Sequence, residues 1–238
     1  MRGPCAAWAS AVAAAAVIGH AGPARAEVGV SLAIDSDDRL RGVSLSDGQP
    51  VANLNLSYDS QGGIYFGASA TAVATRRAGL QNLGETVWLG YARRLDADIS
   101  WDVGATNSVV TGYAGRRTRI DYSEVYAGMT RKDISVHLYY SPSYLGAGSQ
   151  TLYAEVNGAV RPARAWRLFG HVGVLASLGG ANVPYAGRTR YDARAGVARE
   201  FGALELSLAA TTTTPGVEFP EGHSQSRTAL ILAAAYAF

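Results

Sequence analysis

The sequence has 238 residues, and its 21 Lys and Arg against 19 Asp and Glu give a formal net charge of +2. This near balance argues against a nucleic-acid partner, which needs a surplus of positive charge on one face. Beyond the N-terminal segment no run approaches the ~20 continuous apolar residues of a membrane-spanning helix, so a helical membrane protein is excluded.

The first 26 residues have the pattern of a cleaved secretory signal peptide. The apolar stretch Ala6–Ile18 precedes Ala-Arg-Ala at 24–26, which has the form of a cleavage site. Cys5, the only cysteine, leaves with this segment, so we expect no disulfide in the mature chain. The two arginines of the segment leave as well. The mature chain, 27–238, therefore balances its charges, and we expect it to form one domain.

Alternation of apolar and polar residues recurs along the mature chain and predicts β-strands. Leu54 and Leu56 share one face of such a segment, whereas Asn53 and Asn55 share the other. The same pattern predicts about twelve strands, at 28–35, 50–59, 63–73, 85–94, 97–111, 119–131, 133–141, 150–161, 165–177, 188–199, 203–213 and 226–238.

The connections between these segments alternate in length. Short turns such as 95–97 and 131–133 alternate with longer loops such as 35–48 and 74–84. Short turns at one end and long loops at the other are typical of an outer-membrane barrel. The predicted fold class is therefore all-β, an antiparallel up-and-down transmembrane β-barrel with both the N- and the C-terminus in the periplasm.

The alternation by itself does not say which face of the barrel points inward. A soluble, lipocalin-like barrel is apolar inside, and a membrane barrel is apolar outside. The polar face here carries small residues such as Asn53 and Ser100, and aromatics such as Tyr58 and Tyr140 lie near strand ends. Both features favour a membrane barrel with aromatic girdles at its interfaces.

The last predicted strand, 226–238, places Tyr236 and Phe238 on one face. This segment resembles the terminal strand of bacterial outer-membrane barrels, with aromatics at the last and third-from-last positions. The resemblance implies that the barrel-assembly machinery recognises it as an assembly signal and that outer-membrane lipid surrounds the protein. The alternative is the last core strand of a soluble sandwich.

The stretch "SDDRLRGVSLSDGQP", 36–50, resembles the first loop of the TorF-type family of outer-membrane porins, together with "YFGASAT" at 65–71. The loop positions that match are Ser36, Asp37, Arg41, Gly42, Val43, Ser44, Ser46, Gly48 and Pro50. Asp38 and Leu40 stand where that family has aromatics. The resemblance implies an outer-membrane barrel that acts as a porin for small polar or ionic solutes.

The charges of this loop allow two interpretations. Its two arginines, Arg39 and Arg41, can pair with its aspartates, so that the loop folds inward and narrows the mouth of the barrel. Alternatively the loop is exposed and solvated, and its glycines serve only its turns.

Ionisable residues on the polar faces of the strands are the candidates for the pore lining. The set comprises Asp102, Glu124, Glu155, Arg188, Arg190, Asp192 and Arg194. Arginines inside a narrow barrel bias passage toward anions, whereas acidic partners opposite them cancel the field. The alternative to a narrow, water-filled channel is a fully paired polar core that plugs the barrel.

Other function classes find little support in the sequence. An outer-membrane lipid-modifying enzyme needs a Ser–His pair, and His137 shares a face with Ser135, but on the side assigned to the lumen. We therefore predict no catalytic residue. No metal-ligand spacing or phosphate-binding loop indicates a metal or a cofactor. An adhesin would have longer loops.

Overall fold

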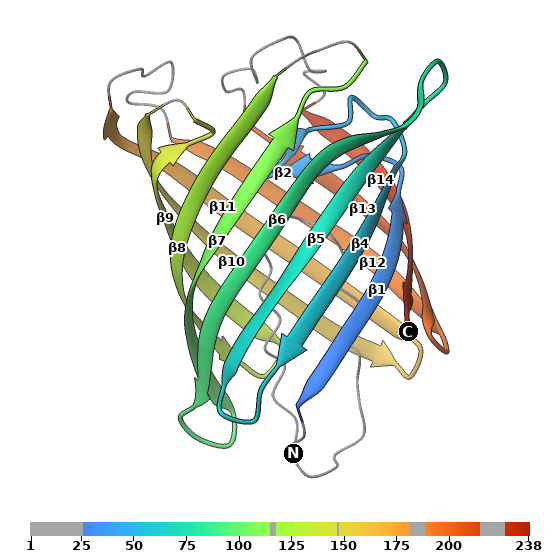
Figure 1. The fold of residues 1–238 in the computed structure, drawn as a ribbon. Coiled ribbons are helices and arrows are strands. Elements are labelled where there is room, and N and C mark those ends of the chain that lie inside the picture. Colours follow the sequence, from blue (N-terminus) through green and yellow to red (C-terminus); the bar gives the residue numbers. More distant parts are fainter. Residues whose placement is uncertain (1–25, 115–117, 147, 181–188, 215–226) are drawn as a thin grey trace.

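The computed structural model describes residues 26–114, 118–146, 148–180, 189–214 and 227–238. Within these ranges twelve strands form one closed antiparallel barrel (Figure 1). The predicted all-β, antiparallel up-and-down barrel and its strand number are confirmed. The predicted signal peptide lies outside the described residues except for Ala26. No helix in the described ranges is long and apolar enough to cross a membrane.

The barrel strands and the two short strands of the first loop have the following bounds: β1 Glu27–Asp35, β2 Arg39–Leu40, β3 Val43–Ser44, β4 Val51–Asp59, β5 Ile64–Thr75, β6 Gly79–Arg94, β7 Ile99–Thr111, β8 Arg119–Arg131, β9 Ile134–Tyr144, β10 Ser149–Ala163, β11 Trp166–Gly180, β12 Arg190–Phe201, β13 Leu204–Thr213 and β14 Thr228–Ala237. β2 and β3 pair only with each other, as a separate two-stranded sheet.

The long loop predicted at 74–84 is wrong. β5 continues to Thr75, β6 begins at Gly79, and these two residues pair across a short turn. The backbone N–H of Ala78 donates to Oγ1 of Thr75 at 3.2 Å, and Gly79 has a φ of 67°. Opposite the step from Thr71 to Ala72, β6 has one extra residue, Leu83, as in a β-bulge. This residue interrupts the alternation of β6 and hides the first part of that strand in the sequence.

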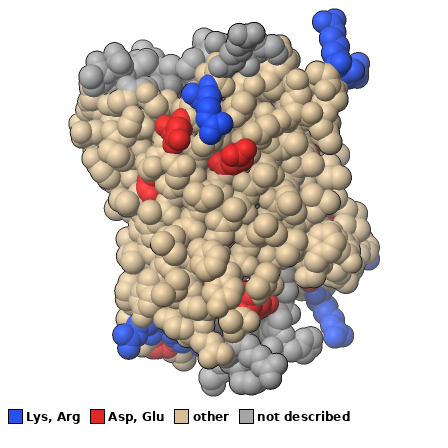
Figure 2. Space-filling model, in the orientation of Figure 1, with Lys and Arg blue, Asp and Glu red and all other residues tan. Residues whose placement is uncertain are grey.

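The apolar face of the wall points outward and the polar face inward. Asn53 is 2% exposed, whereas its neighbour Leu54 is 44% exposed on the outer surface. Figure 2 shows that Lys, Arg, Asp and Glu on the visible face gather toward the two ends of the barrel, with a broad uncharged band between them. This is the arrangement of a barrel whose wall contacts lipid. The soluble, lipocalin-like alternative is wrong.

The barrel closes between β1 and β14. Their register runs from Ser31 opposite Ala237 to Asp35 opposite Ala233, and the backbone N–H of Phe238 donates to the carbonyl of Val30 at 3.0 Å. The rings of Tyr236 and Phe238 lie 5.0 Å apart, edge to face, on the outer surface. The closed seam pairs the backbone N–H and C=O groups that the two edge strands of an open sheet would leave without partners. The soluble-sandwich alternative is therefore wrong as well.

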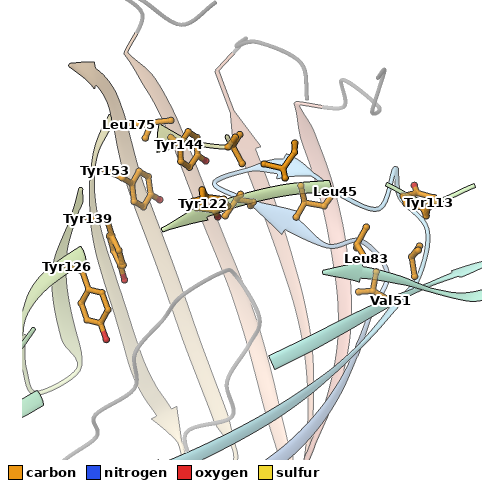
Figure 3. Close-up of a cluster of buried hydrophobic side chains, with 14 of the residues drawn as sticks. Leu45, Val51, Leu83, Tyr113, Tyr122, Tyr126, Tyr139, Tyr144, Tyr153 and Leu175 are labelled. Atoms are coloured by element: carbon orange, nitrogen blue, oxygen red, sulfur yellow. The ribbon is translucent and has the colours of Figure 1, made fainter. Parts of the chain in front are cut away.

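A cluster of buried side chains fills part of the barrel interior. Five of its members are tyrosines on the inner face of β8, β9 and β10, and Figure 3 shows them in one cluster with Leu45 of the first loop: Tyr122, Tyr126, Tyr139, Tyr144 and Tyr153. Loop residues and wall residues thus share one core. This core sits where the first loop enters the lumen, and it fixes the geometry of the candidate site.

Candidate functional site

The loop between β1 and β4 folds into the barrel, and its hairpin β2–β3 lies within the outline of the wall in Figure 1. Leu40 and Leu45 of the loop are buried in the interior core. Of the two interpretations of this loop, the inward-folded one matches the structure. The solvated alternative fails because the loop carries apolar side chains that only the lumen can bury.

Two tight turns explain the two glycines of the loop. Arg41 and Gly42 join β2 to β3, and both have positive φ, at 50° and 78°. Asp47 and Gly48 also have positive φ, at 54° and 71°. The N–H of Gln49 donates to the carbonyl of Ser46 at 2.9 Å and closes this second turn. Two central residues with positive φ are the mark of type I′ turns. Holding Arg41 in this region costs roughly 1–2 kcal/mol, so tertiary contacts must compensate.

Asp37 is the hub that holds the loop in shape. Its Oδ1 accepts from Oγ of Ser44 at 2.5 Å, from Oγ of Ser46 at 2.9 Å and from the N–H of Gly48 at 3.1 Å. Its Oδ2 accepts from Nε of Arg39 at 2.6 Å. Three of the matched motif residues, Ser44, Ser46 and Gly48, thus donate to one buried carboxylate, and the fold of the loop depends on it.

Arg39 belongs to this internal framework. It is 3% exposed, pairs with Asp37, and donates from Nη1 to the carbonyl of Gly42 at 2.8 Å. The sequence predicted Arg39 at the pore constriction. The structure places its guanidinium inside the loop, where it stabilises the β2–β3 turn.

Arg41 crosses the lumen to the opposite wall. Its Nη2 donates to both carboxylate oxygens of Glu124 on β8, at 2.7 and 2.9 Å. Its guanidinium carbon lies 4.0 Å from the ring centroid of Tyr153, 4.8 Å from that of Tyr144 and 5.9 Å from that of Tyr139. Burial alone would lower the pKa of Arg41, but Tyr144 and Glu124 raise it well above its ordinary value. Arg41 therefore stays charged.

Gly42 brings the hairpin tip against β12 and β13. A Cβ at this position would lie 2.6 Å from Cβ of Thr213 and 3.0 Å from Cβ of Asp192. Only glycine satisfies both this close approach and the positive φ. The loop therefore contacts two separate parts of the wall, through Arg41 and through Gly42.

One transverse row of the inner wall carries three of the predicted carboxylates. Consecutive pairs across β7 to β12 place them in the order Asp102, Gly128, His137, Glu155, Gly173 and Asp192. Nε2 of His137 lies 3.3 Å from Oδ1 of Asp102. The two glycines are gaps that neighbouring side chains fill. A Cβ on Gly128 would meet the His137 ring, and one on Gly173 would meet the hydroxyl of Tyr153.

A hydrogen-bonded chain holds the other end of this row. Nδ2 of Asn157 donates to Glu155 at 3.1 Å, and its Oδ1 lies 2.7 Å from Nδ1 of His171. Nε2 of His171 lies 2.8 Å from Oδ1 of Asp192, and the hydroxyl of Tyr153 donates to the same carboxylate at 3.2 Å. Side-chain partners thus hold Glu155 and Asp192 in place on the lumen wall.

β12 presents the predicted charged ladder to the lumen. Arg190 is 7% exposed, and its Nε has no hydrogen-bond partner among the described residues. The guanidinium carbon of Arg194 lies 5.5 Å from the ring centroid of Phe169. Arg190, Asp192 and Arg194 share the inner face of β12. Arg188 lies outside the described residues. The structure therefore places Asp102, Glu124, Glu155, Arg190, Asp192 and Arg194 on the inner face, in a wall of mixed charge.

Sequence reasoning missed the tyrosines as functional candidates. Tyr139 and Tyr153 lie on the polar faces of their strands, so the alternation already pointed them inward. Tyr144 fell in a predicted loop, because β9 continues past Ser141 to Tyr144. Aromatic residues on an otherwise polar face are the feature that could have identified the first two.

A small internal cavity of ≈ 40 Å³ lies between the loop and β4–β8. Asp38 lines it together with Asn53 and Thr86. Burial and, to a smaller extent, the neighbouring Asp35 and Asp37 carboxylates raise the pKa of Asp38 to about 7, against a lowering contribution from the Arg39 N–H. In the described part of the chain no group of His, Cys, Asp and Glu could hold a metal ion.

We predict that Gly42→Ala displaces the loop, whereas Gly48→Ala does not. Both substitutions place a side chain at positive φ, at a cost of roughly 1 kcal/mol, but only the Gly42 Cβ meets the wall, since Gly48 has nothing within 4 Å. Trypsin digestion of the folded protein measures this, because cleavage after Arg39 or Arg41 requires an open loop. Equal protection of the two variants would contradict the proposed close contact.

Asp38 makes the stability of the packed loop depend on pH. Its pKa is raised from 3.8 to about 7, so its contribution is complete below about pH 4 and is lost as the pH rises through about 7. One pKa unit corresponds to about 1.4 kcal/mol. We expect the temperature at which the barrel unfolds on a gel to fall between pH 5 and pH 8, and Asp38→Asn to flatten this dependence. An unchanged slope in the variant would assign it to another group.

Comparison with solved structures shows that this barrel is similar in fold to porins. Three solved structures share the fold: a KdgM porin in complex with disordered oligogalacturonate (10% identity, TM-score 0.54, 88% of this chain and 99% of that chain), a KdgM porin (11%, 0.53, 88% and 99%) and a NanC porin (10%, 0.56, 89% and 99%). At such low identity the likeness concerns the fold alone. No curated protein matches the sequence.

Residues 19–220 match the family described as "Bacterial protein of unknown function (Gcw_chp)". The family model does not carry the TorF name that the loop motif suggested. Because the match covers most of the sequence, the chain belongs to the Gcw_chp family of bacterial proteins.

Proposed function

We propose that this protein is a porin-like channel of the bacterial outer membrane, through which small polar or ionic solutes pass along a narrow, charged lumen. The observation that carries the proposal is the first loop, which folds into a closed twelve-strand barrel and meets the far wall through Arg41 and Glu124. A loop held across a lumen is the constriction that a selective channel needs.

The wall supports this proposal in two ways. Its outer face is apolar and its inner face polar, so a path along the inside is the one that water and ions can use. The structural neighbours are porins, and one of them was solved with oligogalacturonate, a polar solute. These features favour a channel over an enzyme.

The proposed constriction has a movable part and a fixed part. Arg41 is the movable part, because it sits at the tip of a hairpin. The fixed part is the wall lining, to which we assign Asp102, Glu124, Glu155, Arg190, Asp192 and Arg194. Carboxylates on β7, β8 and β10 face the arginines of β12, so charges of both signs line the path. Such a lining weakens the anion preference that the arginine ladder alone would give.

The location and assembly of the protein complete the proposal. A signal peptide at 1–26 exports the chain, the two ends of the barrel domain face the periplasm, and outer-membrane lipid surrounds the wall. Tyr236 and Phe238 present their rings to the outside beside the closing seam. We assign them to recognition by the barrel-assembly machinery.

A plugged structural barrel is the second candidate, and the buried interior cluster favours it. Tyr122, Tyr126 and Tyr144 pack with Leu45 of the loop and leave little open space at their level. The two candidates differ in what happens when the loop is released: a channel opens, whereas a plug of wall side chains stays closed.

Planar-bilayer recordings distinguish the two candidates. We expect wild-type protein to give small conductance steps and Asp37→Ala to give larger ones, because the substitution removes the hub that shapes the constriction. Asp98→Ala is the matched control, since Asp98 is exposed and pairs only with Lys132 at 3.5 Å among the described residues. An absence of steps from both wild type and Asp37→Ala would establish the plugged barrel.

The assembly role of Phe238 has a separate test. We expect Phe238→Ala to lower the amount of folded barrel in outer-membrane fractions severalfold while leaving refolding in detergent unchanged. Phe201→Ala is the control, because Phe201 is another exposed outer aromatic and lies at the turn before β13. An equal loss for both variants would indicate a general need for interface aromatics.

A further inference from the structure

The lumen wall contains a built site for a cationic group, and the chain fills this site with its own Arg41. The site has one carboxylate, that of Glu124, which takes two hydrogen bonds from the guanidinium. The rings of Tyr153, Tyr144 and Tyr139 lie around the same guanidinium at 4.0, 4.8 and 5.9 Å. A carboxylate combined with aromatic faces is the usual means of binding guanidinium and ammonium groups.

The wall holds the site without help from the loop. Glu124, Tyr139, Tyr144 and Tyr153 belong to three consecutive barrel strands, and all four are buried. The rings pack against one another. The ring centroid of Tyr139 lies 5.4 Å from that of Tyr126 and 6.1 Å from that of Tyr153. The rings of Tyr144 and Tyr122 meet edge to face, with their centroids 5.3 Å apart. We will call Glu124 with Tyr139, Tyr144 and Tyr153 the tyrosine cage. Its parts are in place before a ligand arrives.

Arg41 is an imperfect occupant of the tyrosine cage. Only its Nη2 bonds to Glu124, and its buried Nη1 has no hydrogen-bond partner among the described residues. Arg41 also has a φ of 50°, which strains a residue other than glycine. The loop, in contrast, is shaped by bonds within itself, through Asp37. Arg41 can therefore leave the cage while the loop keeps its own fold.

The row of the wall next to the cage continues the preference for cations. Asp102, Glu155 and Asp192 share this row, one step from Tyr139 and Tyr153 along their strands. A cation that leaves the cage toward the short-turn end of the barrel meets these carboxylates. An anion would have to pass Glu124 and then the same row.

We propose that the tyrosine cage is the recognition site for solutes that bear a guanidinium group, and that Arg41 is a tethered stand-in for them. Such a solute takes the place of Arg41 on Glu124 and frees the tip of the loop. This inference rests on the proposed channel function only for its consequence, which is that the solute opens its own path. Binding at the cage does not require that the barrel conducts.

The first test measures binding alone. Arg41→Ala empties the cage, and we expect the variant, in detergent, to bind methylguanidinium saturably by calorimetry. Wild type should bind about tenfold more weakly or worse, because Arg41 occupies the site for most of the time. Methylurea, a neutral molecule of the same shape, should bind to neither. Arg41→Ala combined with Glu124→Gln should lose the binding, and Arg41→Ala combined with Glu85→Gln should keep it, since Glu85 is exposed on the outer wall.

Arg41→Met is a second variant for the case that Arg41→Ala does not fold. It removes the charge but keeps the apolar part of the side chain. If both variants fold, as judged by heat-modifiable mobility, and neither binds methylguanidinium, the site is rejected. Binding that survives Glu124→Gln rejects it too, because it then lies elsewhere.

The second test measures the consequence in planar bilayers. We expect methylguanidinium, but not methylurea, to increase the open time of wild-type channels, and Arg41→Ala channels to be open without it. Loss of this effect with binding intact would overturn the channel mechanism and leave the cation site standing. Loss of binding with conductance intact would overturn the cation site and leave the channel standing.

Discussion

The contact between Arg41 and Glu124 is the interaction on which the arrangement of the lumen depends. Two charged groups leave water together, and three tyrosine rings replace the solvent around the guanidinium. Removing one partner of a buried pair leaves an uncompensated charge, which typically costs 3–5 kcal/mol. Arg41 keeps its strained backbone conformation because the contact with Glu124 stabilises the structure by more than the strain costs. The course of the Arg41 side chain across the lumen to β8 follows from this contact.

Glycine at selected wall positions makes the inner surface possible. A barrel of this size has little room, and side chains from neighbouring strands would collide if every inward position carried a Cβ. Gly128 and Gly173 leave space for His137 and Tyr153, and Gly42 lets the hairpin tip touch β12 and β13. The polar groups then meet partners: Asp102 contacts His137, and Asp192 accepts from Tyr153. Asp102 and Asp192 can therefore be retained on the inner wall at a tolerable cost.

Sequence reasoning predicted the local features well and failed where distant segments meet. The strand at 50–59 could be predicted because Leu54 and Leu56 alternate with Asn53 and Asn55. The β5–β6 turn could not be predicted, because a bulge at Leu83 of β6 shifts the alternation. Arg41 was a candidate on charge alone, but its partner Glu124 lies 83 residues away. Arg39 was assigned to the constriction for the same reason, and only the fold shows that it faces Asp37.

By itself the sequence determined that the chain forms about twelve strands and which residues share a face of each strand. These are consequences of residue order within about ten positions, because the alternation of apolar and polar residues sets the two faces. The tertiary structure decided that the loop folds inward, which tyrosines surround Arg41, and which carboxylates find partners. Barrel closure fixes these contacts, because the register between strands, unlike the alternation within one strand, brings residues together that the sequence holds far apart.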